Sequence, residues 1–212
     1  MSFFGLSLSV PILDGLRYGL ITAFLLGPVF FTLLKNATQF GRNAGISTAI
    51  GIIVSDIVVI SICFLATASL LESIKTEPLV KYLGAAILLF MGLKFVIKPS
   101  IIDQSSIKTS KNSNWGYFIQ GFLVNGVNPF VFIVWIGFIT IGKNHYSGGS
   151  LYIFLASILA GIFITDVLKS FLADRIRPFL KPKYLKIAYR IIGVILIVFA
   201  LRLIILALEP YF

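Results

Sequence analysis

Residues 46–71 read ISTAIGIIVSDIVVISICFLATASLL, and Asp56 is the only charged residue among them. A run this long and apolar is sufficient for one α-helix to cross a bilayer, which takes about 20 residues. Five further runs have the same character, at about residues 12–34, 79–97, 117–142, 150–172 and 187–208. The strands of a membrane barrel would instead be short and alternating. The sequence therefore predicts an all-α integral membrane protein with six transmembrane helices.

The composition agrees with a membrane protein and excludes several other classes. Of the 212 residues, 58% are hydrophobic and 12% are charged, whereas a soluble domain has about 25% charged residues. We therefore exclude soluble enzymes, disordered chains and nucleic-acid-binding domains, despite the net charge of +10. The single cysteine, Cys63, and the single histidine, His145, cannot form a metal cluster of several such ligands. We expect no cofactor and no bound metal.

The distribution of Lys and Arg predicts the orientation. Loops one, three and five carry eleven of these residues, against four on the opposite side. Because positive loops stay in the cytoplasm, we expect a multi-pass protein of the cytoplasmic (inner) membrane with both termini outside. We also expect no cleavable signal peptide. The polar loop 98–115 is then cytoplasmic and separates a first three-helix half, residues 1–97, from a second, residues 116–212.

The two halves resemble each other. Residues 51–56 read GIIVSD and residues 161–166 read GIFITD, at an offset of 110. The helix-breaking pairs at residues 27–28 and 128–129 match at an offset of 101. Three helices is an odd number, so the second half enters the membrane from the other side. The pattern predicts two inverted three-helix repeats, an architecture of secondary transporters whose substrate sites lie near the midplane, between the halves.

Two aspartates in apolar runs are the first candidates for a functional site. A charge at the centre of a bilayer costs at least about 2.5–3.5 kcal/mol, so such residues usually have a purpose. Asp56 and Asp166 are predicted to carry a proton or a cation in an internal cavity. The alternative is that each is neutralised by a structural partner. For Asp166 that partner would be Lys169, one helical turn further on.

The two helix breaks supply the remaining candidates. Proline removes a helical hydrogen bond, and the freed backbone groups at a break can bind a substrate or an ion. We therefore expect Gly27, Pro28, Asn125, Asn128 and Pro129 to line the substrate or ion site. The two asparagines could equally satisfy the broken backbone, and the two roles are compatible.

These motifs resemble those of the LysE/RhtB family of amino-acid exporters. That family has a Gly-Pro break followed by G-x-x-x-G, Gly and Asp, which here correspond to residues 27–28, GRNAG at 41–45, Gly51 and Asp56. Its second signature, G-F-x-x-N-x-x-N-P, corresponds to residues 121–129. Leu26 stands where the family often has a further proline. The resemblance implies export of amino acids or similar small solutes, driven by a proton or cation gradient.

Other functions stay open at this point. A divalent cation exporter or a channel of the same superfamily would have similar segments. An intramembrane aspartyl protease needs two carboxylates that share a proton, but the residues before the aspartates, Ser55 and Thr165, do not match such a protease. We therefore expect a transporter and not an enzyme. Its partners would be a small-molecule substrate, a coupling ion and the lipid bilayer, and the small-residue faces permit a homodimer.

Overall fold

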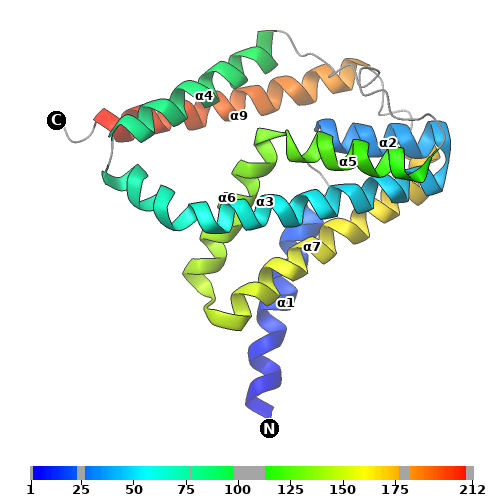
Figure 1. Cartoon of the computed structure of the whole chain (residues 1–212), viewed down its shortest axis with the longest axis horizontal. Coiled ribbons are helices and arrows are strands. Elements are labelled where there is room, and N and C mark those ends of the chain that lie inside the picture. The colour runs from blue at the N-terminus through cyan, green and yellow to red at the C-terminus, as the bar shows by residue number, and fades with distance from the viewer. Residues whose placement is uncertain (1, 23–26, 77, 98–112, 177–181, 209–212) are drawn as a thin grey trace. The chain divides into compact units, whose positions relative to one another are not determined.

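The computed structural model describes residues 2–22, 27–76, 78–97, 113–176 and 182–208, in which all the regular secondary structure is helical (Figure 1). The helices are α1 (Ser2–Thr22), α2 (Pro28–Phe40), α3 (Arg42–Thr76), α4 (Pro78–Ile97), α5 (Asn114–Gly126), α6 (Pro129–His145), α7 (Gly148–Phe171), α8 (Ala173–Ile176) and α9 (Pro182–Leu208).

Several of these helices can cross a membrane. Within the described ranges, three stretches are long and apolar enough by themselves: Arg42–Leu65, Gly148–Phe171 and Tyr189–Leu208. A fourth is the pair Asn114–Gly126 and Phe130–His145, which is bent by 69° at the break. These helices fit a multi-pass all-α membrane protein. The predicted run 12–34 falls on α1 and α2, with residues 23–26 outside the described part, and six spans stay a prediction.

The chain divides into two compact units. The first contains residues 1–65 and 105–180, and the second contains residues 66–104 and 181–212. Each unit therefore combines helices from both predicted halves. The division into halves at residues 98–115 stays a prediction, since residues 98–112 lie outside the described part.

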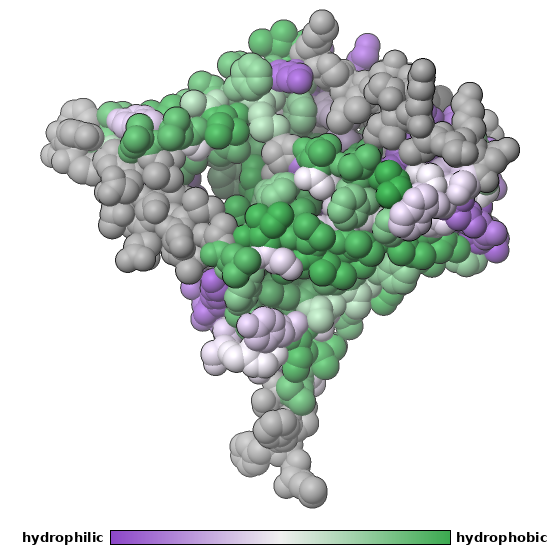
Figure 2. Space-filling model, viewed as in Figure 1, coloured by the Kyte–Doolittle hydropathy of each residue, from purple (hydrophilic) through white to green (hydrophobic). Residues whose placement is uncertain are grey.

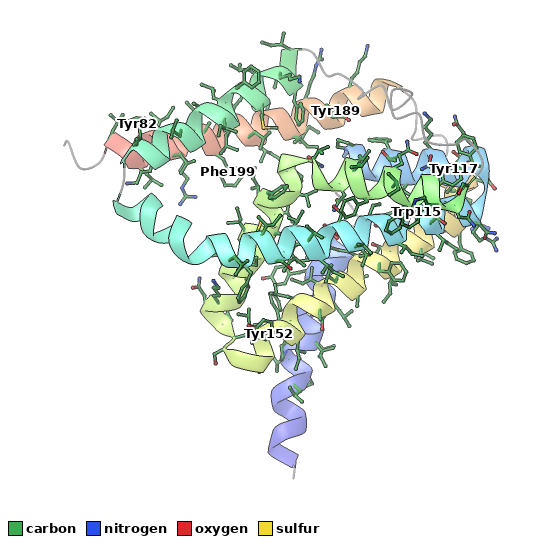
Figure 3. The ribbon with its side chains drawn as sticks, viewed as in Figure 1. Tyr82, Trp115, Tyr117, Tyr152, Tyr189 and Phe199 are labelled. Carbon is green, nitrogen blue, oxygen red and sulfur yellow. The ribbon has the colours of Figure 1, made fainter. Side chains whose placement is uncertain are left out.

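In the second unit, α4 and α9 pack antiparallel at a pair of glycines. A Cβ on Gly92 would lie 2.8 Å from the Gly193 carbonyl oxygen, so only glycine permits this close approach. Lys81 at the start of α4 donates from Nζ to the carbonyl oxygen of Leu206 near the end of α9, at 2.9 Å. The ring of Tyr189, labelled in Figure 3, meets another aromatic ring of α4 edge-on.

In the first unit, two parallel helix pairs pack through glycines. Helix α1 runs along α7 (Figure 1), and a Cβ on Gly19 would lie 2.5 Å from the Ile158 carbonyl oxygen. Helix α3 runs along α5, where a Cβ on Gly121 would collide with the carbonyl oxygen of Thr48. Small residues of this kind let helices approach where lipid provides no hydrophobic driving force.

Large apolar side chains fill the centre of the first unit and also cover its outside. The core includes Trp135, Ile139, Phe154 and Ile158, all almost fully buried. Many other large apolar residues are exposed, and hydrophobic colouring extends over much of the described surface in Figure 2. An apolar exterior of this extent suits contact with lipid chains and not with water.

Candidate functional site

The carboxylate of Asp56 lies at a junction of three helices. Asp56 is on α3 and is only 3% exposed. Its Oδ1 accepts hydrogen bonds from Asn125 Nδ2 of α5, at 2.8 Å, and from Trp135 Nε1 of α6, at 2.9 Å. Among the described residues, no donor is bonded to its other oxygen, Oδ2. The site thus has one oxygen held by two N–H groups and one available to a proton or a cation.

The close packing of α3 on α5 places Asn125 beside Asp56. At Gly51, a Cβ would collide with the carbonyl oxygen of Phe118, so the two backbones touch one turn before the aspartate. Asn125 Nδ2 also donates to the carbonyl oxygen of Ile52, at 3.3 Å. The two donors stabilise a negative charge on Asp56, whereas burial destabilises it.

The residue before Asp56, Ser55, carries a buried hydroxyl. Ser55 is 1% exposed, and its Oγ has no hydrogen-bond partner in the described part of the chain. A Cβ on Gly126 would lie 3.0 Å from this oxygen, so the backbone at the end of α5 lies directly over it. An unsatisfied buried polar group costs about 1–3 kcal/mol. The hydroxyl is therefore a ready partner for a bound ion or solute.

The break between α5 and α6 is stabilised by its own asparagine. Asn128 is the N-cap of α6, and its Oδ1 accepts a hydrogen bond from the backbone N–H of Phe130, at 3.2 Å. Pro129 occupies the first helical position, where an N–H would have no acceptor within the helix, so the proline costs no hydrogen bond. Asn128 therefore satisfies the broken backbone, whereas Asn125 reaches Asp56. The two asparagines thus have different partners, and their place in a substrate or ion site stays a prediction.

The other predicted break also begins a helix. Gly27 is the N-cap of α2 in an extended conformation, and Pro28 follows at the start of the helix. Thr32 Oγ1 donates to the Pro28 carbonyl oxygen, at 2.8 Å. Among the described residues, the hydrogen bonds to Asp56 come from α5 and α6, and none comes from Gly27 or Pro28. Residues 23–26, which lead into this break, are not described.

Asp166 has the local ion pair that its spacing allowed. Lys169 Nζ lies 2.9 Å from Asp166 Oδ1, and both side chains are largely buried. The ammonium group also lies over the ring of Phe30, 5.5 Å from its centre. The ion pair with Lys169, given by the sequence as the alternative for Asp166, is present, and a carrier role for Asp166 stays a prediction. The partners of the two aspartates thus differ, since Asp56 binds neutral N–H donors and Asp166 binds a cation.

A second polar cluster escaped the sequence reasoning. Asn36 Nδ2 of α2 donates to Thr48 Oγ1 of α3, at 2.9 Å, and to Gln120 Oε1 of α5, at 3.0 Å. All three side chains are buried. Beside them, the rings of Phe40 and Tyr117 lie 5.2 Å apart, and Figure 3 labels Tyr117 on α5. Thr48 and Gln120, polar residues inside apolar runs, were the signal that could have revealed this cluster, whereas Asn36 lies just beyond the end of its run.

Comparison with known proteins agrees with the motifs. The family model described as LysE type translocator matches residues 20–207. The leucine efflux protein of Salmonella typhimurium is 26% identical over 219 residues, covering 88% of this chain and 96% of that protein. The same figures hold for the leucine efflux protein of Salmonella typhi.

A further relative is the uncharacterized membrane protein YrhP of Bacillus subtilis. It is 29% identical over 186 residues, covering 80% of this chain and 87% of that protein. No solved structure matches the chain. The family model covers most of the chain, from the end of α1 to the end of α9, and confirms the resemblance seen in the motifs. The chain belongs to the LysE type translocator family.

Proposed function

We propose that the protein exports amino acids with apolar side chains, or similar small solutes, across the cytoplasmic membrane. The family is one of translocators, and the relatives named leucine efflux protein are similar over nearly their whole length. The observation that carries the proposal is the Asp56 carboxylate, buried at a junction of α3, α5 and α6. Intramembrane ionisable residues of this kind mark transport pathways.

The coupling residue in this proposal is Asp56. A proton or cation from outside binds at Oδ2 while Asn125 and Trp135 hold Oδ1 in place. Release of that ion on the cytoplasmic side leaves the carboxylate free and charged, ready for the next proton or cation, and substrate moves outwards in exchange. Asp166 occupies the equivalent place in the second half but has Lys169 as a fixed counter-ion. The proposal therefore gives the carrier role to Asp56 alone.

The architecture in this proposal is the inverted repeat of six spans. Reciprocal glycine contacts support it. Gly19 meets the Ile158 carbonyl, and Gly121, at an offset of 102, meets that of Thr48. Likewise, a Cβ on Gly161 of α7 would lie 3.1 Å from the carbonyl oxygen of Leu16 on α1. A Cβ on Gly51 of α3 would collide with the carbonyl oxygen of Phe118 on α5, the residue equivalent to Leu16. Related contacts on both helix pairs are expected of two halves with one fold.

The helix directions also support this arrangement. If the second half is inverted, α1 and α7 run the same way through the membrane, as do α3 and α5, whereas α4 and α9 run in opposite ways. The glycine contacts have these directions in each pair. With the predicted orientation, both termini lie outside and the Asn36 cluster lies towards the cytoplasm.

The test is efflux of labelled leucine from proteoliposomes. Asp56→Asn keeps an oxygen for both N–H donors but cannot exchange a proton. We expect it to abolish efflux driven by an imposed pH gradient, while exchange of leucine across the membrane survives. Asp174→Asn, on the short helix α8 and exposed, is the matched control and should behave as wild type.

Two results would contradict the proposal. If Asp56→Asn drives efflux at the wild-type rate under the gradient, then Asp56 is a structural residue held by its hydrogen-bond partners. If wild-type liposomes transport manganese or zinc ions but no leucine, then the protein is the cation exporter that the sequence left as an alternative.

A further inference from the structure

A cavity outside the Asp56 site is lined by residues of α1, α6 and α7 and of the connection between α6 and α7. Figure 1 shows α1 passing close to this connection. Its volume is about 310 Å³, at the lower end of the range of about 300–1,000 Å³ for small-molecule pockets. Seven side chains line it: Val10, Asp14, Tyr18, Ile141, His145, Tyr146 and Phe154. The cavity lies within the first unit and includes no residue assigned to the transport site above.

The one acidic group among these lining residues is fixed in place. Asp14 Oδ2 accepts a hydrogen bond from Tyr146 Oη, at 2.6 Å, and Oδ1 pairs with Arg17, at 3.2 Å. Arg17 is exposed and does not line the cavity. Each carboxylate oxygen has two lone pairs, so Asp14 can accept further N–H donors from a ligand. Water screens the exposed Arg17 charge more than that of a ligand inside the cavity.

Aromatic rings form the wall beside this carboxylate. Phe154 contacts Tyr18, with ring centres 5.8 Å apart, and Tyr146, with ring centres 5.1 Å apart. Burial, together with the hydrogen bond to Asp14, raises the pKa of Tyr146 to about 12, so its hydroxyl stays a donor at physiological pH. Ring faces attract cations placed within about 6 Å. A carboxylate beside aromatic rings is thus a favourable environment for an ammonium group.

The remaining lining residues determine which chemical group attached to the ammonium ion the cavity accepts. Val10 and Ile141 are aliphatic, and no Lys or Arg is among the lining residues. We propose that this cavity binds small primary ammonium ions with an apolar chain, the ammonium group at Asp14 and the chain against Val10, Ile141 and Phe154. Amino acids with apolar side chains have the same ammonium group and chain and carry a carboxylate in addition, so the inference rests on the proposed function and names a second place where the ammonium end of the substrate binds.

A continuous run of rings joins this cavity to the transport site. Tyr18 contacts Phe138, with centres 5.6 Å apart, and Phe138 contacts Trp135, with centres 5.7 Å apart. Trp135 is the residue that donates to Asp56. With the predicted orientation, the cavity lies nearer the outer face of the membrane than Asp56 does. A solute exported from the Asp56 site would bind here last, before it leaves the protein.

The test measures binding of two probes to the full-length protein in lipid nanodiscs, by saturation-transfer NMR. Isopentylamine has the ammonium group and the apolar chain, whereas 4-methylpentanoate has the chain and a carboxylate. We expect saturable binding of the amine and none of the acid. Asp14→Asn, which can still accept from Tyr146, should weaken amine binding at least about tenfold, which is about 1.4 kcal/mol. The control Asp174→Asn should leave the affinity unchanged.

A second variant tests the same cavity without changing a charge. Val10→Trp fills the space between α1 and the rest of the lining, and should abolish amine binding even if Asp14→Asn does not fold. The inference is wrong if wild-type protein shows no saturable amine binding, or if both variants bind as wild type does. Leucine efflux is measured separately in liposomes. Amine binding without efflux refutes the proposed function only, and efflux without amine binding refutes the cavity only.

Discussion

Replacing Gly121 by alanine should separate α3 from α5 and disturb the Asp56 site. A carbon and a carbonyl oxygen in contact stay roughly 3.3–3.6 Å apart. The new Cβ would lie far inside that distance from the Thr48 carbonyl oxygen, which is backbone and cannot rotate away. Overpacking of this kind costs about 1–3 kcal/mol. The chain can lower that cost only by moving the two helices apart.

The same movement acts on the hydrogen bond four residues further along α5. Asn125 Nδ2 lies 2.8 Å from Asp56 Oδ1, and a displacement of about half an ångström takes it beyond the usual limit for an N–H···O bond. We expect Gly121→Ala to lower leucine efflux about tenfold. We also expect it to lower the midpoint of thermal unfolding, by about 2–4 °C for each kcal/mol in a chain of this size.

Gly137→Ala is the matched control, because in the described part of the chain no atom beyond the neighbouring backbone of its own helix lies within 4 Å of a Cβ at that position. Both variants place alanine inside a helix and gain its higher helix propensity, about 0.5–1 kcal/mol, so their difference isolates the contact. The measurements are thermal unfolding of the purified proteins and efflux from liposomes. If Gly121→Ala equals Gly137→Ala in both, the close contact of α3 with α5 does not hold the site together.

Three further predictions concern topology and charge. In a background without the native cysteine, an impermeant thiol reagent outside sealed cells should label a cysteine at exposed position Asn144 but not at Gln39; the opposite pattern reverses the orientation. Lys169→Met should lower the free energy of unfolding by about 3–5 kcal/mol by leaving Asp166 unpaired. Adding Asp166→Asn to Lys169→Met should recover most of the lost free energy of unfolding. If the single and the double variant lose equal amounts of that free energy, the ion pair does not stabilise the protein. Between pH 10 and about 12, wild-type stability should fall as pH rises, because Tyr146 loses its proton earlier in the unfolded state; Tyr146→Phe should flatten this part of the pH profile.

Much of the architecture could be read from local patterns. Length and apolarity predicted helices, and the pairs Gly27-Pro28 and Asn128-Pro129 predicted where they break, because proline's missing N–H acts at its own position. The same is true of the ion pair between Asp166 and Lys169, since residues three apart face each other on a helix. Such interactions depend on neighbours in the chain and need no knowledge of the tertiary structure.

The hydrogen-bond partners of Asp56 and Asn36 could not be predicted from local patterns. Trp135 is 79 positions from Asp56, and as one of many aromatic residues in apolar runs it carries no local signal that it donates to a carboxylate. Gln120 is 84 positions from Asn36. The distance between packed helices decides which buried polar groups can form hydrogen bonds. Glycines that contact another helix set this distance, so the pairing depends on tertiary packing and not on local sequence.

The glycine contacts also limit how the protein can move. Where backbone rests on backbone, as at Gly19 and Gly121, there is no layer of side chains to change rotamer and let one helix slide past the other. Each of these helix pairs then behaves as a stiff rod. Helix α2 is bonded to the α3–α5 pair through Asn36, and so belongs with that pair. Motion of one helix pair against the other would then be a discrete rigid-body step on the microsecond-to-millisecond timescale of collective motions, and not a gradual deformation of the whole bundle.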